Sequence, residues 1–284
     1  MPALAILFLL IGAVLHTAWN LLLKNSDDKY ITTWWMVVNG GLLSLTALWF
    51  TGLPPREVWV FIFFSVLVEA VYFITLSYAY RDNEFSLIYP IARGAAPAFL
   101  AIWSFLFLHE KLTDGGMAGL FLIIIGLAVI GLSDLLKSRT DNLHLRGVAV
   151  AIFIALLISI YTIIDGAAVK RSSALPYVFT VFSLVPIALA PFVLKQYGWK
   201  RLTQTWRTQG FRLVLPAVLG VSAYLLALLA YRIAPLSYSG AVREVSVVMG
   251  AFAGWRFFGE KMGSIRLIGS FVIFAGILII ALLG

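Results

Sequence analysis

Ten apolar runs, each of about 20 residues, occupy most of this 284-residue chain and constrain its fold more than any other feature. A helix of about 20 apolar residues, rising 1.5 Å per residue, crosses a hydrocarbon core of about 30 Å. We therefore predict an all-α integral membrane protein with ten transmembrane helices. The predicted spans are residues 2–23, 31–52, 58–80, 85–108, 115–134, 147–169, 176–195, 212–232, 236–258 and 264–283.

The few charged residues lie mostly between these runs. Only 12% of the residues are charged and 62% are apolar, and a soluble domain carries roughly twice that share of charge. This composition excludes a water-soluble enzyme and a disordered chain. The net charge of +8 lies at span ends, where membrane proteins keep Lys and Arg, so we expect no nucleic-acid partner. Because the chain has no Cys, disulfides and thiolate sites are excluded, and we expect neither a metal nor a cofactor.

The chain repeats itself at a shift of 150 residues. Arg93 recurs as Arg243, Gly119 as Gly269 and Gly126 as Gly276. Because five spans is an odd number, the second copy enters the membrane from the opposite side, which makes an inverted repeat. We expect a first five-helix repeat at 1–134, a connecting loop at 135–146 and a second repeat at 147–284. The glycine stripes predict close packing of span 5 on span 10, or a dimer contact.

Several of these residues carry a family resemblance. The motifs, in chain order, are Leu15-His16-Thr-Ala-Trp19-Asn20, Tyr89-Pro90-Ile-Ala-Arg93-Gly94, Glu110-Lys111, Arg243-Glu244-Val-Ser246 and Gly259-Glu260-Lys261. With the duplicated ten-span plan, the chain resembles EamA-type transporters of the drug/metabolite transporter superfamily, and within it a subgroup associated with phosphonate utilisation. The resemblance implies secondary transport, often export, of small metabolites such as amino acids through a cavity between the two halves.

Two charges predicted at membrane depth are related by the repeat. Arg93 and Arg243 lie eight and seven residues into their spans, or about 11–12 Å deep. Guanidinium groups match carboxylate, phosphate and phosphonate oxygens and keep their charge when buried. We predict that both arginines bind the acidic group of a substrate in a central cavity. The alternative is that each arginine is neutralised by an internal carboxylate.

Glu69 and Glu244 are the carboxylates available for that alternative. Glu69, in the middle of span 3, is expected to bind a substrate amine, to carry a coupling proton or to pair with Arg93. Glu244 is expected either to anchor a hydrogen bond between helices or to bind substrate. Glu244 follows Arg243 by about 100° around the helix, so we expect that the two side chains do not point the same way.

The remaining candidates for the substrate site are a histidine and aromatic residues at helical spacing from these groups. They are His16, Trp19, Tyr72 and Tyr89. Each has an alternative role as a packing residue in the helix core. Asp165, near the end of span 6, is expected to pair with Lys170 at the interface.

The function that we expect is secondary active transport by an exporter or permease that works by alternating access. The expected substrate is a small anionic or zwitterionic metabolite such as an amino acid or an organophosphonate. Without HExxH, GxSxG or Walker motifs, we expect no enzyme. The alternative is a scramblase-like or flippase-like protein that handles lipid headgroups. The expected partners are the small-molecule substrate and the lipid bilayer, with proton coupling left open and the chain acting as a monomer or homodimer.

The expected location is a bacterial inner membrane, which the chain crosses several times with a retained first span. Ten spans place both termini on one side. The odd-numbered connections between spans hold about 14 Lys and Arg residues, and the even-numbered ones hold about 5. This count would place the odd-numbered connections in the cytoplasm and both termini outside. The family resemblance implies cytoplasmic termini instead. Much of the asymmetry comes from residues 195–212, which form either an amphipathic stretch in the headgroup layer or a solvated basic loop.

Overall fold

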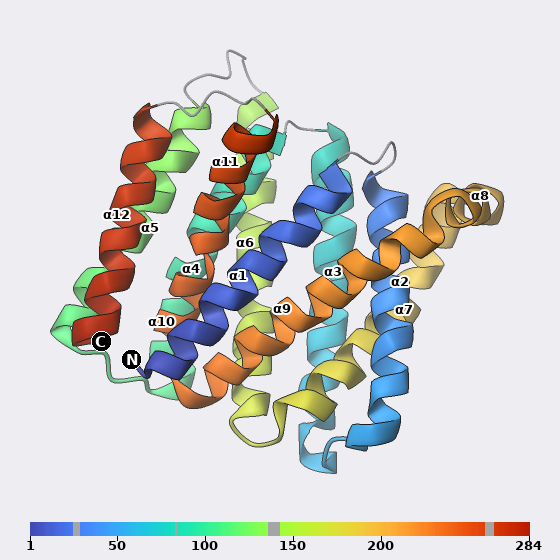
Figure 1. Cartoon of the computed structure of the whole chain (residues 1–284), viewed down its shortest axis with the longest axis horizontal. Coiled ribbons are helices and arrows are strands. Elements are labelled where there is room, and N and C mark those ends of the chain that lie inside the picture. The colour runs from blue at the N-terminus through green and yellow to red at the C-terminus, as the bar shows by residue number, and fades with distance from the viewer. Residues whose placement is uncertain (25–28, 83–84, 136–142, 259–263) are drawn as a thin grey trace.

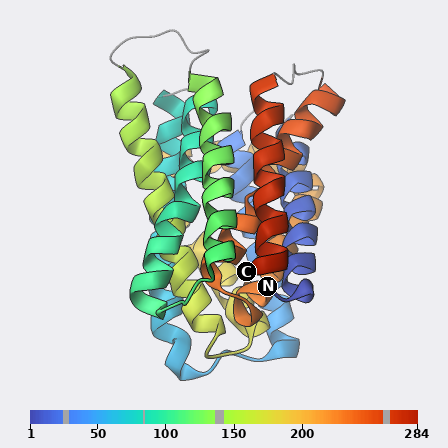
Figure 2. The ribbon, with the colours of Figure 1, turned by 90° about the vertical axis from the view of Figure 1, so that its left-hand side faces the viewer.

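The structure is a computed structural model that describes residues 1–24, 29–82, 85–135, 143–258 and 264–284. Within these residues the regular structure is helical, and the long helices run through one bundle (Figure 1 and Figure 2). Seven helical segments of the described chain are long and apolar enough to cross a membrane. Helices α5 and α12 contain shorter apolar stretches, and α10 with α11 forms an interrupted span, so all ten predicted spans have a counterpart.

The helices follow the predicted spans closely. The first repeat contains α1 (Ala3–Lys24), α2 (Lys29–Thr51), α3 (Trp59–Asp82), α4 (Phe85–Leu108) and α5 (Asp114–Leu135). The second contains α6 (Leu143–Val169), α7 (Ala174–Tyr197), α9 (Val214–Ile233), α10 (Leu236–Arg243), α11 (Val245–Phe258) and α12 (Ser264–Leu283). Three short helices lie in the connections between these helices. η1 (Arg56–Val58) precedes α3, and α8 (Trp199–Gln209) and η2 (Gly210–Leu213) lie between α7 and α9.

The main helix contacts have counterparts when the two repeats are exchanged. α1 packs on α9 as α6 packs on α3, and α4 packs on α6 as α10 and α11 pack on α1. The pairs α5 with α12 and α2 with α7 each join equivalent helices. This exchange symmetry is that of a pseudo-two-fold axis between the repeats.

The contact between α5 and α12 gives the direction of the two repeats. A Cβ on Gly119 would lie 2.7 Å from the carbonyl oxygen of Gly276, and one on Gly126 would lie 2.8 Å from that of Gly269. In a parallel pair, Gly119 would face its own repeat mate Gly269. The two helices therefore run antiparallel, which confirms the inverted repeat and the predicted packing of span 5 on span 10. Both termini lie at the same end, where the Met1 amino group donates to the Gly284 carbonyl oxygen at 2.7 Å (Figure 1).

The ninth predicted span, 236–258, is not one continuous helix. α10 ends at Arg243 and α11 begins at Val245. Between them, the Glu244 N–H donates to the Ala241 carbonyl at 3.0 Å, and the Val247 N–H donates to the Glu244 carbonyl at 2.9 Å. Both bonds span three residues instead of four, which is the tighter pattern of a 3₁₀ turn. The predicted span 236–258 is therefore present, but it consists of two helices that meet at Glu244, one of the candidate site residues.

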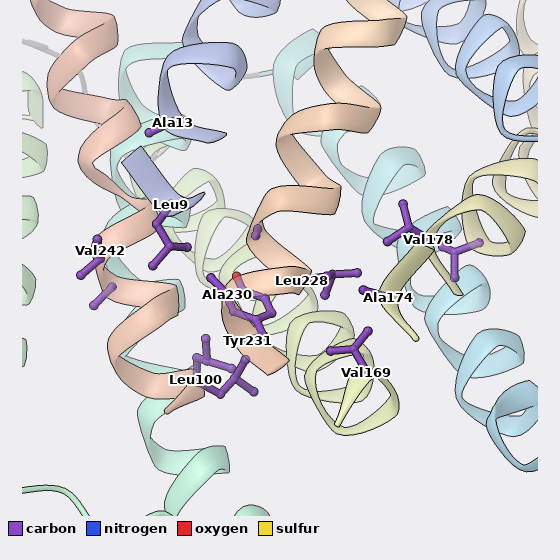
Figure 3. Close-up of a cluster of buried hydrophobic side chains, with 14 of the residues drawn as sticks. Leu9, Ala13, Leu100, Val169, Ala174, Val178, Leu228, Ala230, Tyr231 and Val242 are labelled. Atoms are coloured by element: carbon purple, nitrogen blue, oxygen red, sulfur yellow. The ribbon is translucent and has the colours of Figure 1, made fainter. Parts of the chain in front are cut away.

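A large cluster of buried apolar side chains joins the two repeats next to this break. It includes Leu9 of α1, Leu100 of α4, Leu228 and Tyr231 of α9, and Val242 of α10 (Figure 3). Leu228, Tyr231 and Val242 are fully buried. The cluster thereby fixes the helices that carry the candidate charges against one another.

The glycine contact between α5 and α12 generates the first testable prediction. Gly119→Ala places a methyl group against backbone, so the helices must separate, and we expect a destabilisation of about 1–3 kcal/mol, as for overpacked cores. Gly250→Ala is the matched control, because a Cβ at that position meets nothing within 4 Å. Thermal unfolding in detergent, followed by tryptophan fluorescence, measures both variants. Equal stability of Gly119→Ala and Gly250→Ala would contradict the close antiparallel contact.

Candidate functional site

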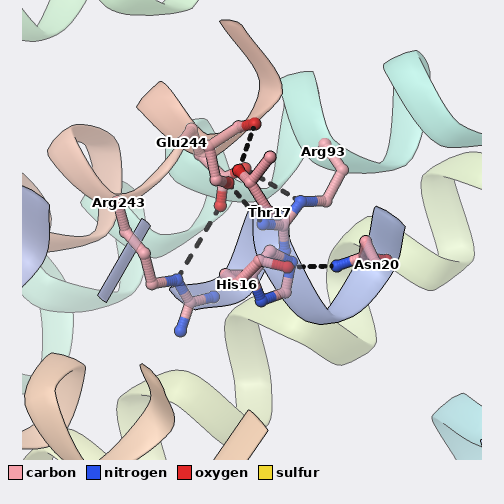
Figure 4. Close-up of polar contacts among 7 residues, drawn as sticks. His16, Thr17, Asn20, Arg93, Arg243 and Glu244 are labelled. Carbon is pink, nitrogen blue, oxygen red and sulfur yellow. Dashed lines mark hydrogen bonds and ion pairs between the residues drawn. The ribbon is translucent and has the colours of Figure 1, made fainter. Parts of the chain in front are cut away.

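Glu244 lies between the two repeat-related arginines (Figure 4). Its Oε2 is 2.9 Å from Nε of Arg93, and its Oε1 is 3.9 Å from Nε of Arg243. The Glu244 side chain is 2% exposed, and those of Arg93 and Arg243 are 10% and 14% exposed. In this conformation one internal carboxylate therefore pairs with Arg93 and lies within 4 Å of Arg243, which is the kind of pairing that the sequence left open as an alternative.

Glu244 and Arg243 are neighbours in the chain, and consecutive side chains leave a helix about 100° apart. Both side chains are long, and Glu244 Oε1 still comes to 3.9 Å from Arg243 Nε. The expectation that the two do not point the same way therefore did not exclude a contact between them. Position 94, the repeat mate of Glu244, is a glycine, so the internal carboxylate belongs to the second repeat only.

Polar contacts tie the arginine cluster to helix α1. Arg93 Nη2 donates to Ser246 Oγ at 3.3 Å, and the Thr17 hydroxyl donates to the Ser246 carbonyl oxygen at 3.3 Å. His16 of α1 lies beside this cluster (Figure 4). Its ring meets that of Trp19 edge to face at 5.1 Å. The structure thus brings together residues of α1, α4 and α10 and Glu244, which follows α10: His16, Trp19, Arg93, Arg243 and Glu244.

A second group of buried polar residues surrounds Asp165, which sequence reasoning had assigned elsewhere. Asp165 is fully buried on α6, where it accepts a hydrogen bond from Tyr177 at 2.6 Å and another from Tyr224. Glu69, 8% exposed on α3, lies near both Asp165 and Tyr224. These carboxyl groups and tyrosines form a second polar cluster, within electrostatic reach of Arg243.

One expected ion pair is replaced by another. Lys170 pairs with Glu110 at 3.3 Å and not with Asp165. Arg93 pairs with Glu244, whereas Glu69 lies near Asp165, a carboxyl group of the same kind. Asp165 lies only four residues before the end of α6, but α7 and α9 cover it with tyrosines. Only contacts between distant helices reveal that burial, so position along the span was a poor guide.

Aromatic rings line both clusters. The Tyr231 ring centroid lies 6.0 Å from the Arg243 guanidinium carbon, within range of a cation–π contact. Tyr72 of α3 meets Tyr161 of α6 edge to face at 5.8 Å. The side chain of Tyr89, the remaining predicted residue, lies outside the described residues. A cavity of about 10 Å³, lined by Thr162, Arg243 and Glu244 among others, leaves space for about one water molecule beside the arginines.

The far end of α10 is held by Glu110, which follows α4. His109 adopts a left-handed φ of 51° and turns the chain after α4. The Glu110 carboxylate accepts from the backbone N–H groups of Leu236 (2.5 Å) and Ser237 (3.1 Å) and from the Ser237 hydroxyl (2.8 Å). A carboxylate at a helix N-terminus satisfies free N–H groups and matches the positive end of the helix dipole. We call these contacts, together with Lys170, the Glu110 latch.

Among the residues that the structure describes, no group of three His, Asp or Glu side chains is arranged to hold a metal ion. The candidate site has two parts. The first is a positive cluster in which Arg93 and Arg243 surround Glu244. The second is an acidic cluster of Asp165 and Glu69 with the tyrosines around them.

The fold is shared with known structures. One solved crystal structure superposes on the chain with a TM-score of 0.76 at 16% sequence identity, covering 100% of this chain and 98% of the other. At this identity the likeness concerns the fold alone. A search of curated proteins found no match.

The family comparison covers nearly the whole chain. The EamA-like transporter family matches twice, over residues 3–132 and 145–282. Each match contains one five-helix repeat, and one of the repeat-related arginines lies in each. The chain therefore belongs to the EamA-like transporter family.

Proposed function

We propose that this protein is a secondary active transporter that carries a small anionic or zwitterionic metabolite, such as an amino acid or an organophosphonate, across a bacterial inner membrane. One observation carries the proposal: two arginines from the two repeats share one buried carboxylate, Glu244, where helix α10 meets α11. Family membership supports membrane transport as such.

The arrangement of Glu244 favours exchange with a substrate anion. Removing one partner of a buried ion pair costs about 3–5 kcal/mol, because an uncompensated charge remains. A substrate carboxylate or phosphonate that takes the place of Glu244 keeps both guanidinium groups paired. Glu244 lies at the α10–α11 break, so its release changes the contacts that hold the two helix segments in line. Binding is thereby coupled to a conformational change.

The balance of charges favours a zwitterion over a simple anion. The two clusters together hold three carboxyl groups, on Glu69, Asp165 and Glu244, against two guanidinium groups. A zwitterion adds no net charge to this buried region. Its acidic group would bind Arg93 and Arg243, while its ammonium group would meet the acidic cluster, where the carboxylate and tyrosine oxygens of Asp165 and Tyr224 accept hydrogen bonds.

Helix α10 couples the site to the Glu110 latch at one end of the bundle. Helix α10 has eight residues and so is about 12 Å long. Its N-terminus is held by the latch and its C-terminus carries Arg243. Movement of α10 after Glu244 is displaced would pull against the latch and open the end at which both termini lie, as alternating access requires.

Loss of either arginine is expected to abolish transport. A thermal-shift panel of amino acids, their deaminated acids, the matching amines and aminophosphonates identifies a substrate, and proteoliposome uptake follows. Arg93→Met and Arg243→Met should weaken binding of that substrate by about 30-fold or more, since truncating a buried charge pair costs about 2–5 kcal/mol. Amino acids should bind more tightly than their deaminated acids.

In each single variant Glu244 can still pair with the remaining arginine. Both variants should therefore be folded and inactive, and a monodisperse profile in size-exclusion chromatography is the control for folding. Full transport by both single variants would contradict the anion site. Stabilisation by lipids alone, with no response to any soluble compound, would favour lipid-headgroup handling instead.

Weakening the latch is expected to open the end of the bundle that holds the termini. Because the chain contains no Cys, a single Ser239→Cys substitution on α10 gives a specific probe at a fully buried position. Glu110→Gln should raise its maleimide labelling rate about tenfold, since hydrogen bonds to charged groups contribute about 1.5–3 kcal/mol. Asp114→Asn, an exposed acid in the first turn of α5, is the matched control. Unchanged labelling in Glu110→Gln would exclude the latch as a gate.

A further inference from the structure

Helix α8 lies across the bundle instead of along it. Figure 1 views α8 almost along its axis, whereas the spanning helices run up the page, and α8 lies at the edge of the bundle near the end opposite the termini. Gly198, with φ 72°, makes the turn from α7 into α8. A helix in this position runs roughly parallel to the membrane surface.

Specific contacts fix α8 to helix α2. Leu202 of α8 is buried, and its carbonyl oxygen accepts a hydrogen bond from Trp35 Nε1 at 2.9 Å. The Trp35 ring also packs on that of Trp206 at 4.7 Å. Asn39 Nδ2 donates to the Gly210 carbonyl at 3.4 Å, just after α8 ends. Residues 199–209 are thus a docked amphipathic helix and not a solvated basic loop.

The outer side of this segment is basic. Residues 195–212 contain five basic residues and no acidic one. Lys200 and Arg207 are exposed and lie seven residues apart, which places them on the same face two turns along. Arg201 is also exposed and lies on the neighbouring polar side. The segment therefore presents a positive surface.

Exposed aromatic residues lie at both ends of the same helix. Trp199 is 66% exposed at its start, and Phe211 is 90% exposed directly after it. Aromatic side chains at the level of lipid headgroups, next to Lys and Arg, are typical of helices that lie in the membrane interface. A soluble acidic partner would use the basic residues but leave these rings in water.

We propose that α8 is a binding surface for anionic phospholipid headgroups. Lys200, Arg201 and Arg207 bind the phosphates, while Trp199 and Phe211 insert beside the acyl chains. The docking of Leu202 and Trp206 on α2 holds the basic face in the headgroup layer. This proposal is independent of the transported substrate, because none of these residues contacts the arginine or acidic clusters.

The test compares lipid binding by the full-length protein and a charge variant. The variant carries Lys200→Gln, Arg201→Gln and Arg207→Gln. The matched control carries Arg56→Gln, Lys111→Gln and Arg232→Gln, three exposed basic residues at the opposite end of the bundle. Native mass spectrometry and thermal shifts in neutral detergent are recorded with phosphatidylglycerol and with phosphatidylcholine. Wild type and control should bind phosphatidylglycerol preferentially. In the α8 variant its affinity should fall on the order of a hundredfold.

A third variant separates charge from folding. Lys200→Arg, Arg201→Lys and Arg207→Lys together keep the positive charge and should retain the lipid preference, which should weaken as salt is added. Equal phosphatidylglycerol binding by the α8 variant and wild type would overturn the proposal. Equal losses of phosphatidylglycerol binding in the α8 variant and in the opposite-end control would also overturn it. So would a mass spectrum in which the α8 variant keeps its bound lipid but changes its oligomeric state.

Discussion

The structure depends on one buried charge arrangement, in which Glu244 lies between Arg93 and Arg243. Neither guanidinium group can lose its proton, so each needs a negative partner at membrane depth. The repeat supplies two arginines but only one carboxylate beside them, since the position after Arg93 is Gly94. The inverted symmetry seen in the glycine contacts between α5 and α12 is therefore broken beside the two arginines. In the proposed function, a substrate anion replaces this single carboxylate.

The interruption of the ninth span connects this ion pairing to the end of the bundle. Glu244 lies outside both α10 and α11, and α10 connects it to the Glu110 latch at the end of the bundle. Exchange of Glu244 for a substrate anion would change the contacts at one end of a short rigid helix whose other end closes the protein. In the proposed function, the acidic cluster of Asp165 and Glu69 would bind the ammonium group of the same substrate. Charge, helix break and latch thus form one connected unit.

Much of the fold followed from the sequence, whereas the partners of its charges did not. Span length and hydropathy predict the helices, and the recurrence of Arg93 and Gly119 predicts an inverted repeat, because both signals are local or repeated. The break at Glu244 has no local signal, since no proline or glycine lies beside it within Arg243-Glu244-Val-Ser246. From the sequence, Asp165 was predicted to lie at the membrane interface. In the structure, Tyr177 of α7 and Tyr224 of α9 bind it inside the bundle. Ion pairs between distant helices are decided by tertiary packing, which periodicity does not encode.

The most direct test of this account is the substrate affinity of Glu244→Gln, measured by isothermal titration with the compound that stabilises wild type. If Glu244 competes with the substrate for both arginines, removing its charge should tighten substrate binding about tenfold or more. Transport should slow, because Glu244 no longer displaces the bound substrate from the arginines. Replacing a charged internal partner by a neutral one of the same shape leaves packing almost unchanged. Unchanged or weaker binding by Glu244→Gln would contradict the competition on which the account rests.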